Sequence, residues 1–283
     1  MHSALSLHLC TIKNASFTGV WATSDSVANL FGTQVTDIAN TAVRIDMSAR
    51  GYLASQDKEG VLVPTVLQRV SLARGGFGVV SNGGDVRVIE GTVIKNLAQG
   101  LRCNGGNVWF YSAGEPNHLI ENYIGITAIG CNLMMNGPVE VSRNLGWGMV
   151  LRNTTAVTQW GIGPQMIDNN GTAGEASSGG IFASNGTYLN LLNGQVTGNK
   201  GPGVQVEDTA SARLFHMTIS GNTGYGIMAG ALSVVEVGAN TVRNNGGVDL
   251  FCTPNGHGRG DPAGIAKMIC SGFNQSPSPG KID

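Results

Sequence analysis

The sequence predicts an all-β solenoid of about ten coils, and three observations lead to this prediction. A pair of Gly or Ala with an apolar residue recurs ten times, and seven of the nine steps between pairs are 21 to 25 residues long. Repetition at this period is typical of solenoids. An Asn precedes most pairs by two to five residues, and short Val, Ile and Leu runs lie between them. The pairs are Gly19-Val20, Ala42-Val43, Gly78-Val79, Gly100-Leu101, Gly125-Ile126, Gly148-Met149, Gly180-Ile181, Gly203-Val204, Gly226-Ile227 and Gly247-Val248.

Each part of the repeat suits its place in a β-coil. Asn and Gly supply the corners because both tolerate positive φ, and Asn side chains stacked in register can hydrogen-bond along the column. Alternation in residues 203–207 and 214–219 places apolar side chains inside and polar ones outside. The 43 glycines and the 12% of charged residues are typical of stacked turns. The coil interior is therefore expected to be dry and narrow.

The chain is expected to form one β-helical domain over residues 1–251, followed by an irregular C-terminal segment and tail over residues 252–283. A net charge of −1 predicts no nucleic-acid partner and no anionic membrane surface. No apolar run approaches the roughly 18 residues needed to span a bilayer. The first ten residues lack the features of a signal peptide, and we expect upstream sequence to be missing.

The five cysteines give separate predictions. Cys252 and Cys270 bracket a segment rich in Gly and Pro, so they form either a disulfide or two free thiols. Cys103 lies at an inward position of its coil and is expected to be a small core residue. A disulfide between Cys252 and Cys270 would place the protein outside the cytoplasm.

Three turns carry a resemblance to a known family: residues 199–204, 222–227 and 244–248, which follow or approach the pattern Asn-x-Gly-x-Gly-[Ile/Val]. Over residues 10–251 the chain resembles right-handed parallel β-helix proteins of the pectate-lyase-like superfamily. That superfamily includes polysaccharide lyases, glycoside hydrolases, uronate epimerases, phage tailspikes and non-enzymatic adhesins. The resemblance implies an extracellular or phage-associated protein that engages polysaccharide, but fold alone does not choose among these activities.

Known catalytic motifs are incomplete in this chain. Of the motifs that polygalacturonase-like hydrolases carry, only Gly256-His257-Gly258 is present, and no Asp-Asp pair occurs. The run Glu115-Pro116-Asn117-His118 departs from the Asp-Pro-His-[Glu/Asp] motif of alginate epimerases. We interpret the first match as chance and the second as a turn that lengthens its coil.

The outward positions lie two and four residues after the first residue of each repeated pair. Aligning these positions between coils gives the best cluster of polar residues in the chain. Coils stack about 4.8 Å apart, so five polar residues should share a patch about 10 Å long. They are Arg44, Asp46, Asn82, Arg102 and Asn104. Calcium-dependent lyases need two or more carboxylates together with an Arg or Lys base. With one carboxylate here, no cofactor is predicted, and a Ca²⁺ site lacks support.

Two interpretations of this patch remain open. In the first, Arg44 or Arg102 is the base or a uronate clamp, Asp46 is the partner acid, and Trp21, Asn82, Asn104 and Arg152 bind substrate. In the second, Arg44 pairs with Asp46 on an ordinary surface, and Trp21 packs under an N-terminal cap. The insertion from Tyr52 to Pro64, with Asp57-Lys58-Glu59, is expected to wall a groove beside the patch.

A second column holds the residues immediately before four corner Asn residues. The charges of these residues alternate in sign. The column contains Lys95, Glu121, Arg143 and Asp168 and predicts a ladder of surface ion pairs. The predicted function is polysaccharide engagement, by a lyase or hydrolase or by a non-catalytic adhesin or scaffold. Assembly as a homotrimer, as in tailspikes, fits either alternative.

Overall fold

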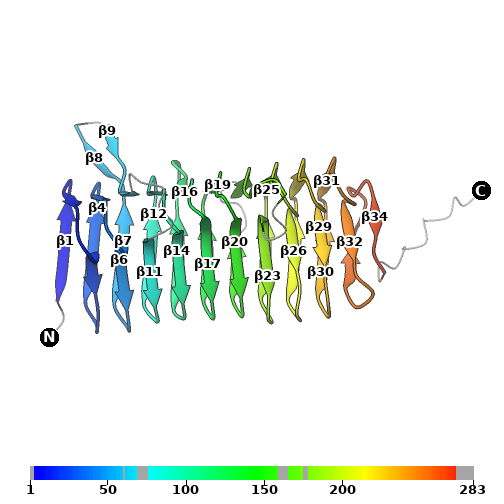
Figure 1. Ribbon diagram of the computed structural model, residues 1–283, viewed down its shortest axis with the longest axis horizontal. Helices are drawn as coiled ribbons and strands as arrows, with labels where there is room; N and C mark the ends of the chain where they lie inside the picture. The colour runs from blue at the N-terminus through cyan, green and yellow to red at the C-terminus, as the bar shows by residue number, and fades with distance from the viewer. Residues whose placement is uncertain (1–2, 60, 69–75, 159–164, 175–177, 272–283) are drawn as a thin grey trace, which may run out of the picture.

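A computed structural model describes residues 3–59, 61–68, 76–158, 165–174 and 178–271. Throughout these ranges the regular elements are β-strands, and none of the described residues is helical. Three long parallel sheets run the length of the molecule, and their strands stack along one axis (Figure 1). This confirms the predicted all-β solenoid of about ten coils. No helix in the described ranges is long and apolar enough to cross a membrane.

Each coil passes through the three sheets in the order A, B, C. Sheet A consists of β1 (Ala4–His8), β4 (Val27–Phe31), β7 (Arg50–Ala54), β12 (Asp85–Ile89), β15 (Asn107–Tyr111), β18 (Asn132–Asn136), β21 (Thr155–Thr158), β24 (Tyr188–Leu192), β27 (Ser211–Phe215), β30 (Val234–Gly238) and β33 (His257–Gly260). Sheet B consists of β2 (Thr11–Lys13), β5 (Gln34–Thr36), β10 (Val66–Gln68), β13 (Val93–Lys95), β16 (Asn117–Ile120), β19 (Val139–Ser142), β22 (Gln165–Asp168), β25 (Gly194–Thr197), β28 (Thr218–Ser220) and β31 (Thr241–Arg243).

Sheet C consists of β3 (Thr18–Ala22), β6 (Thr41–Asp46), β11 (Phe77–Asn82), β14 (Gln99–Asn104), β17 (Ile124–Ile129), β20 (Trp147–Arg152), β23 (Gly179–Ser184), β26 (Val204–Val206), β29 (Ile227–Ala229), β32 (Leu250–Cys252) and β34 (Met268–Ile269). Paired strands therefore extend past residue 251, because β33 pairs with β30 and β34 pairs with β32. A separate antiparallel hairpin is formed by β8 (Gln56–Lys58) and β9 (Val61–Val63).

The Gly-plus-apolar pairs stack in sheet C. Leu101 aligns with Ile126, and Ile126 aligns with Met149. A Cβ atom added to Gly125 would lie 2.6 Å from the carbonyl oxygen of Gly148, so this position requires glycine. The last predicted pair, Gly247-Val248, is wrong in register, because Leu250 is the residue that aligns with Ile227.

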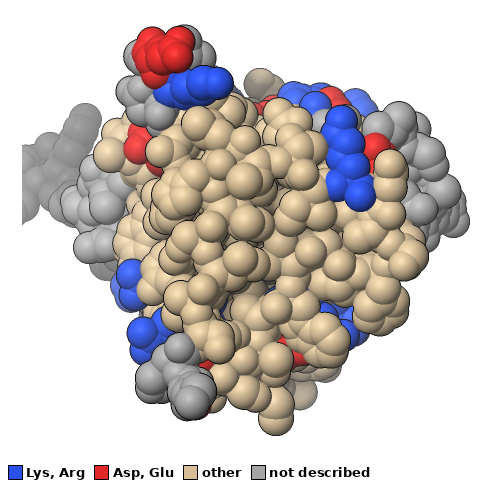
Figure 2. Space-filling model, turned by 90° about the vertical axis from the view of Figure 1, so that its left-hand side faces the viewer, with Lys and Arg blue, Asp and Glu red and all other residues tan. Residues whose placement is uncertain are grey.

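The inward side chains form one core that extends along the coils from Val20 to Cys252. Alternation along each strand produces it: in β27 the buried Ala212 and Leu214 alternate with the partly exposed Ser211, Arg213 and Phe215. At the N-terminal end, Leu5, Leu9 and Phe17 are exposed. Figure 2 shows that uncharged residues cover the centre of this end and that charged residues lie at its rim.

A ladder of buried Asn side chains runs along the corner between sheets B and C. Its members are Asn122, Asn144, Asn170, Asn199, Asn222 and Asn245. Asn170 is representative: its Nδ2 donates to the Val141 carbonyl at 2.8 Å and to Asn199 Oδ1 at 3.0 Å. Asp249 Oδ1 accepts from Asn245 Nδ2 at 2.8 Å and ends the series. The predicted Asn stacking is therefore present.

The residues with positive φ lie one position before the ladder residues. The prediction that the same Asn both turns the chain and stacks along the column is therefore wrong. Glu121, Arg143 and Asn169 have φ of 58°, 54° and 53°, whereas the ladder residues are outside the left-handed region. The corner therefore needs two residues: the first turns the chain, and the second supplies the buried amide. Asn96 and Asn244, with φ of 59° and 60°, belong to the first kind.

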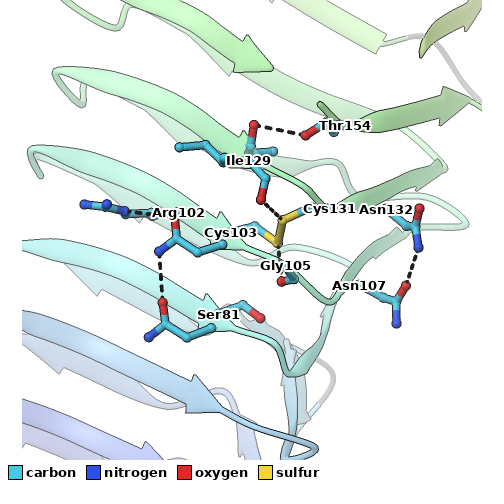
Figure 3. The surroundings of a disulfide bond; sticks show 12 residues. Ser81, Arg102, Cys103, Gly105, Asn107, Ile129, Cys131, Asn132 and Thr154 are labelled. Atoms are coloured by element: carbon cyan, nitrogen blue, oxygen red, sulfur yellow. Dashed lines mark hydrogen bonds between the residues drawn. A yellow bond between two sulfur atoms is a disulfide. The ribbon is translucent and has the colours of Figure 1, made fainter. Parts of the chain in front are cut away.

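Two disulfides join neighbouring parts of the stack. Cys252 is bonded to Cys270, which is the predicted pair. Cys103 lies in the core with its side chain buried, as predicted, and it is also bonded to Cys131 across adjacent coils (Figure 3), which was not predicted. Cys10 is free.

Replacing Asn170 by Ala should lower the free energy of unfolding by about 2 kcal/mol, because it leaves the Val141 carbonyl and neighbouring ladder groups without their buried partners. Urea unfolding at neutral pH measures the change. Asn190→Ala on the outer face of sheet A is the control and should change stability by less than about 0.5 kcal/mol. Equal effects of the two substitutions would contradict a stabilising role for the ladder.

The Cys103–Cys131 bond closes a loop with a sequence separation of 28 residues. Loop-closure entropy predicts that Cys103→Ala with Cys131→Ala lowers stability by roughly 3 kcal/mol. Thermal unfolding of the double variant, compared with Cys10→Ala, measures this loss. An unchanged melting temperature in the double variant would show that the coils are held together without the bond.

Candidate functional site

The outer face of sheet C brings together the five residues of the predicted polar patch. Arg44 aligns with Trp21 on one side and with Val80 on the other, and Val80 aligns with Arg102. In the neighbouring column Asp46 aligns with Asn82, which aligns with Asn104. The lateral alignment predicted from the repeat is therefore correct in this part of the sheet.

Asp46 is the centre of a hydrogen-bond network. Its Oδ2 accepts from Trp21 Nε1 at 2.8 Å and from Arg44 Nε at 2.7 Å, and its Oδ1 accepts from Asn82 Nδ2 at 2.7 Å. The network continues to the next coil, where Asn104 Nδ2 donates to Asn82 Oδ1 at 2.9 Å. Arg102 Nε donates to Asn104 Oδ1 at 3.4 Å.

This network holds Asp46 as a carboxylate. Burial alone would raise the pKa of Asp46, but the hydrogen bonds from Asn82, Arg44 and Trp21 outweigh it and lower the pKa below 3.8. An ionised carboxylate has no proton to give near neutral pH, and both its oxygens are already occupied. The contacts therefore favour the salt-bridged interpretation of Arg44 and Asp46 over a catalytic acid.

Two arginines of the patch also lie on aromatic rings. The Arg44 guanidinium is 5.0 Å from the centroid of Trp21, and that of Arg102 is 5.6 Å from the centroid of Phe77. Trp21 is still 56% exposed and lines a hollow of about 300 Å³ together with Leu5 and Val27. Trp21 thus keeps exposed ring surface, while its indole N–H is used by Asp46.

A separate pocket surrounds Arg152 farther along sheet C. It has a volume of about 380 Å³ and is lined by Tyr123, Ile124, Gly146, Trp147, Val150, Arg152, Phe182 and Gln205. The rings of Trp147 and Phe182 are 5.5 Å apart and tilted by 43°. Ion pairs among the described residues do not include Arg152. The pocket therefore combines aromatic surface with a cation that has no carboxylate partner there.

The predicted groove wall lies elsewhere. The β8–β9 hairpin follows β7 of sheet A and precedes β10 of sheet B, and it projects from the stack near the N-terminal end (Figure 1). Its position at the corner between sheets A and B is separated from the outer face of sheet C. The described residues of the insertion at 52–64 therefore do not border the Asp46 network.

The residues that the structure describes contain no group of three or more His, Cys, Asp or Glu side chains placed to hold a metal ion. Asp46, the carboxylate of the patch, already accepts three hydrogen bonds. The structure therefore adds no support for a Ca²⁺ site on the outer face of sheet C.

Comparison with known proteins identifies the fold. A family model described as "Right handed beta helix region" matches residues 150–258. Over these residues the chain is similar to right-handed β-helix proteins, and its three stacked parallel sheets make it a parallel β-helix. No curated protein and no solved structure matched it. The family match and the three stacked parallel sheets agree on architecture, and neither assigns a substrate to this β-helix.

Sheet B of the β-helix carries a charged cluster that the sequence did not predict. His118 Nδ1 lies 2.5 Å from Glu140 Oε2, and Ser142 Oγ donates to Glu140 Oε1 at 2.5 Å. The hydrogen bond from His118 lowers the pKa of Glu140 to about 2 against the effect of burial, with help from Ser142 and the charges of His118 and Arg143. Register explains the cluster, because His118 and Glu140 are aligned in adjacent strands.

The predicted four-member ion ladder is wrong. Arg143 does pair with Glu121 at 3.6 Å, and it also reaches Glu140 at 3.4 Å. Lys95 aligns with Ile120 and Asp168 aligns with Ser142, so both lie one position before the corner that Glu121 and Arg143 occupy. Burial, followed by the charge of Glu140, raises the pKa of Asp168.

The low pKa of Glu140 predicts a pH-dependent contribution to stability. Its folded-state pKa of about 2 lies below the ordinary Glu value of 4.5, so the stabilisation is complete above pH 4.5 and is lost as pH falls toward 2. Glu140→Gln should therefore cost on the order of 1–2 kcal/mol at pH 7, allowing for solvent screening, and less at pH 3. Urea unfolding at both pH values measures this difference, with Glu207→Gln as control. A cost that is the same at pH 7 and pH 3 would contradict the assignment.

Proposed function

We propose that this β-helix binds a polysaccharide along the outer face of sheet C, and that the protein acts outside the cell or on a phage particle. The observation that supports the proposal is the pocket around Arg152. Its aromatic side chains offer a surface on which a sugar ring stacks, and the guanidinium offers a fork of N–H donors. The pocket lies on a rigid strand face, which lowers the entropic cost of binding.

The shape of the face also fits a polymer. Successive strands of sheet C present the same outward positions about every 4.8 Å, from Trp21 at one end past the Arg152 pocket. Trp21, Asn82, Asn104 and Arg152 are the proposed contacts on this face. Such repetition suits a chain of similar sugar units better than a single small molecule.

Binding without turnover fits the contacts better than lyase or hydrolase chemistry. Asp46 is ionised and already accepts three hydrogen bonds, so a catalytic role for Arg44 or Arg102 would have to proceed without the partner acid. A guanidinium is a poor base because it stays protonated in proteins. In the proposal, Arg44 and Arg102 therefore clamp acidic groups of the polymer.

The two disulfides support an extracytoplasmic location. Disulfides persist in oxidising compartments and are rare in the cytosol. Both bonds of this chain join segments of neighbouring coils and strengthen an exposed, elongated molecule. Assembly as a homotrimer stays a prediction.

Isothermal titration calorimetry tests the proposal by measuring binding to pectin, alginate, chondroitin sulfate and a neutral glucan. Arg152→Ala and Phe182→Ala should each weaken binding to the preferred polymer about tenfold, because each removes one recognition element of the pocket. Arg243→Ala on sheet B is the charge-matched control and should change affinity less than twofold.

Unsaturated-product absorbance and reducing-end assays on the same polymers measure turnover, and none is expected. Turnover that falls with Arg44→Ala or Arg102→Ala would replace the binding proposal by an enzymatic one. Absence of binding to every polymer, or binding that ignores Arg152 and Phe182, would refute the proposed site.

A further inference from the structure

A second arrangement of arginine and aromatic residues lies on the outer face of sheet A. Arg87 on β12 aligns with Tyr52 of the preceding coil and with Trp109 of the following coil. Its guanidinium carbon is 5.3 Å from the centroid of Tyr52 and 5.6 Å from that of Trp109. Contact with both rings restricts the guanidinium and leaves its N–H edge available to a planar or tetrahedral anion.

The arginines near this stack have no carboxylate partner among the described residues. Arg50 and Arg87 are both exposed, and neither takes part in an ion pair there. Asp85 aligns with Arg50 but does not pair with it. Instead, Asp85 Oδ1 accepts from Asn107 Nδ2 at 2.7 Å, and Asn107 Oδ1 accepts from Asn132 Nδ2 at 2.9 Å. Figure 3 shows the Asn107–Asn132 contact.

A small cavity lies between these side chains. It measures about 130 Å³ and is lined by Arg50, Tyr52, Asp85 and Arg87. A hollow of this size suits a compact oxyanion better than a whole sugar ring. Arg50 also lines an adjoining hollow of about 300 Å³ with Asp25, Val27 and Ser48.

These hollows are linked to the sheet C face. Val27 lines the second hollow together with Arg50, and it lines a third together with Trp21. Shared lining residues therefore connect Trp21 with the Arg50–Arg87 cavity around the corner between sheets C and A.

We propose that Arg50 and Arg87 form a subsite for an oxyanion carried by a glycan, either a sulfate ester or a carboxylate. This inference rests on the proposed polysaccharide function and narrows it to acidic polymers. Arg87 supplies a fork of donors held by the two rings, and Arg50 supplies the second cation. Asp85 offers its second oxygen to a sugar hydroxyl beside the anionic group, which distinguishes a glycan from a bare anion.

Titration calorimetry with dextran sulfate, polygalacturonate and unmodified dextran tests the subsite. The wild-type protein should bind at least one charged polymer more tightly than dextran, and binding should weaken as salt is raised. Arg50→Ala and Arg87→Ala should each weaken that binding about tenfold. Comparison of the two charged polymers shows whether sulfate or carboxylate is the preferred group.

Three control variants separate the subsite from net charge and from the sheet C site. Arg259→Ala removes the same charge from sheet A at an arginine already paired with Glu236 and should change affinity less than twofold. Arg87→Lys keeps the charge but loses the planar fork, so it should restore only part of the affinity. Arg152→Ala tests the sheet C pocket independently in the same assay, and the melting temperature of every variant confirms folding.

Either of two results would overturn the inference. One is equal affinity for charged polymers and dextran. The other is charged-polymer binding that Arg50→Ala and Arg87→Ala leave unchanged. In the second case, loss of binding by Arg152→Ala would leave the sheet C proposal standing. Loss in the Arg50 and Arg87 variants with no effect of Arg152→Ala would instead support the subsite and refute the sheet C pocket.

Discussion

The register between stacked coils is the constraint on which every other feature of this molecule depends. Main-chain hydrogen bonds between parallel strands fix which residues become lateral neighbours, although these are typically more than 20 positions apart in sequence. The buried Asn ladder reinforces that register at the corner between sheets B and C, because its central side chains, those of Asn144, Asn170, Asn199 and Asn222, each bond both the preceding coil and the next. A slip of one residue would break both connections and turn core side chains toward solvent.

Fixed register also determines which charged groups are satisfied within the protein. Where opposite charges or amides align, they satisfy one another: Asp46 is enclosed by Trp21, Arg44 and Asn82, and Glu140 by His118 and Ser142. Such groups stabilise the stack by satisfying one another. Arg87 and Arg102, which take part in no ion pair among the described residues, lie beside aromatic rings, and this combination favours the proposed binding over catalysis.

The sequence predicted the outer face of sheet C well because the repeated Gly residues, from which positions were counted, lie in that sheet. Counting from Gly100 places Arg102 and Asn104 correctly, since strand periodicity is preserved within β14. The same count fails at Gly247, where the coil shifts by two residues. It also says nothing about sheets A and B, because turns of different length separate them from the glycines. For that reason His118 with Glu140, and Arg87 with its two rings, became visible only in three dimensions.

Corners and disulfides were harder to predict for a related reason. Asn96 and Asn122 look equivalent in sequence, but one turns the chain with positive φ and the other is a buried ladder residue. Cys131 lies in a turn whose distance from Cys103 depends on the path of a complete coil. Local propensity identifies where a coil bends, whereas the pairing of residues across coils requires the register. The proposed recognition surface depends on that pairing, so single-residue motifs predict little of it.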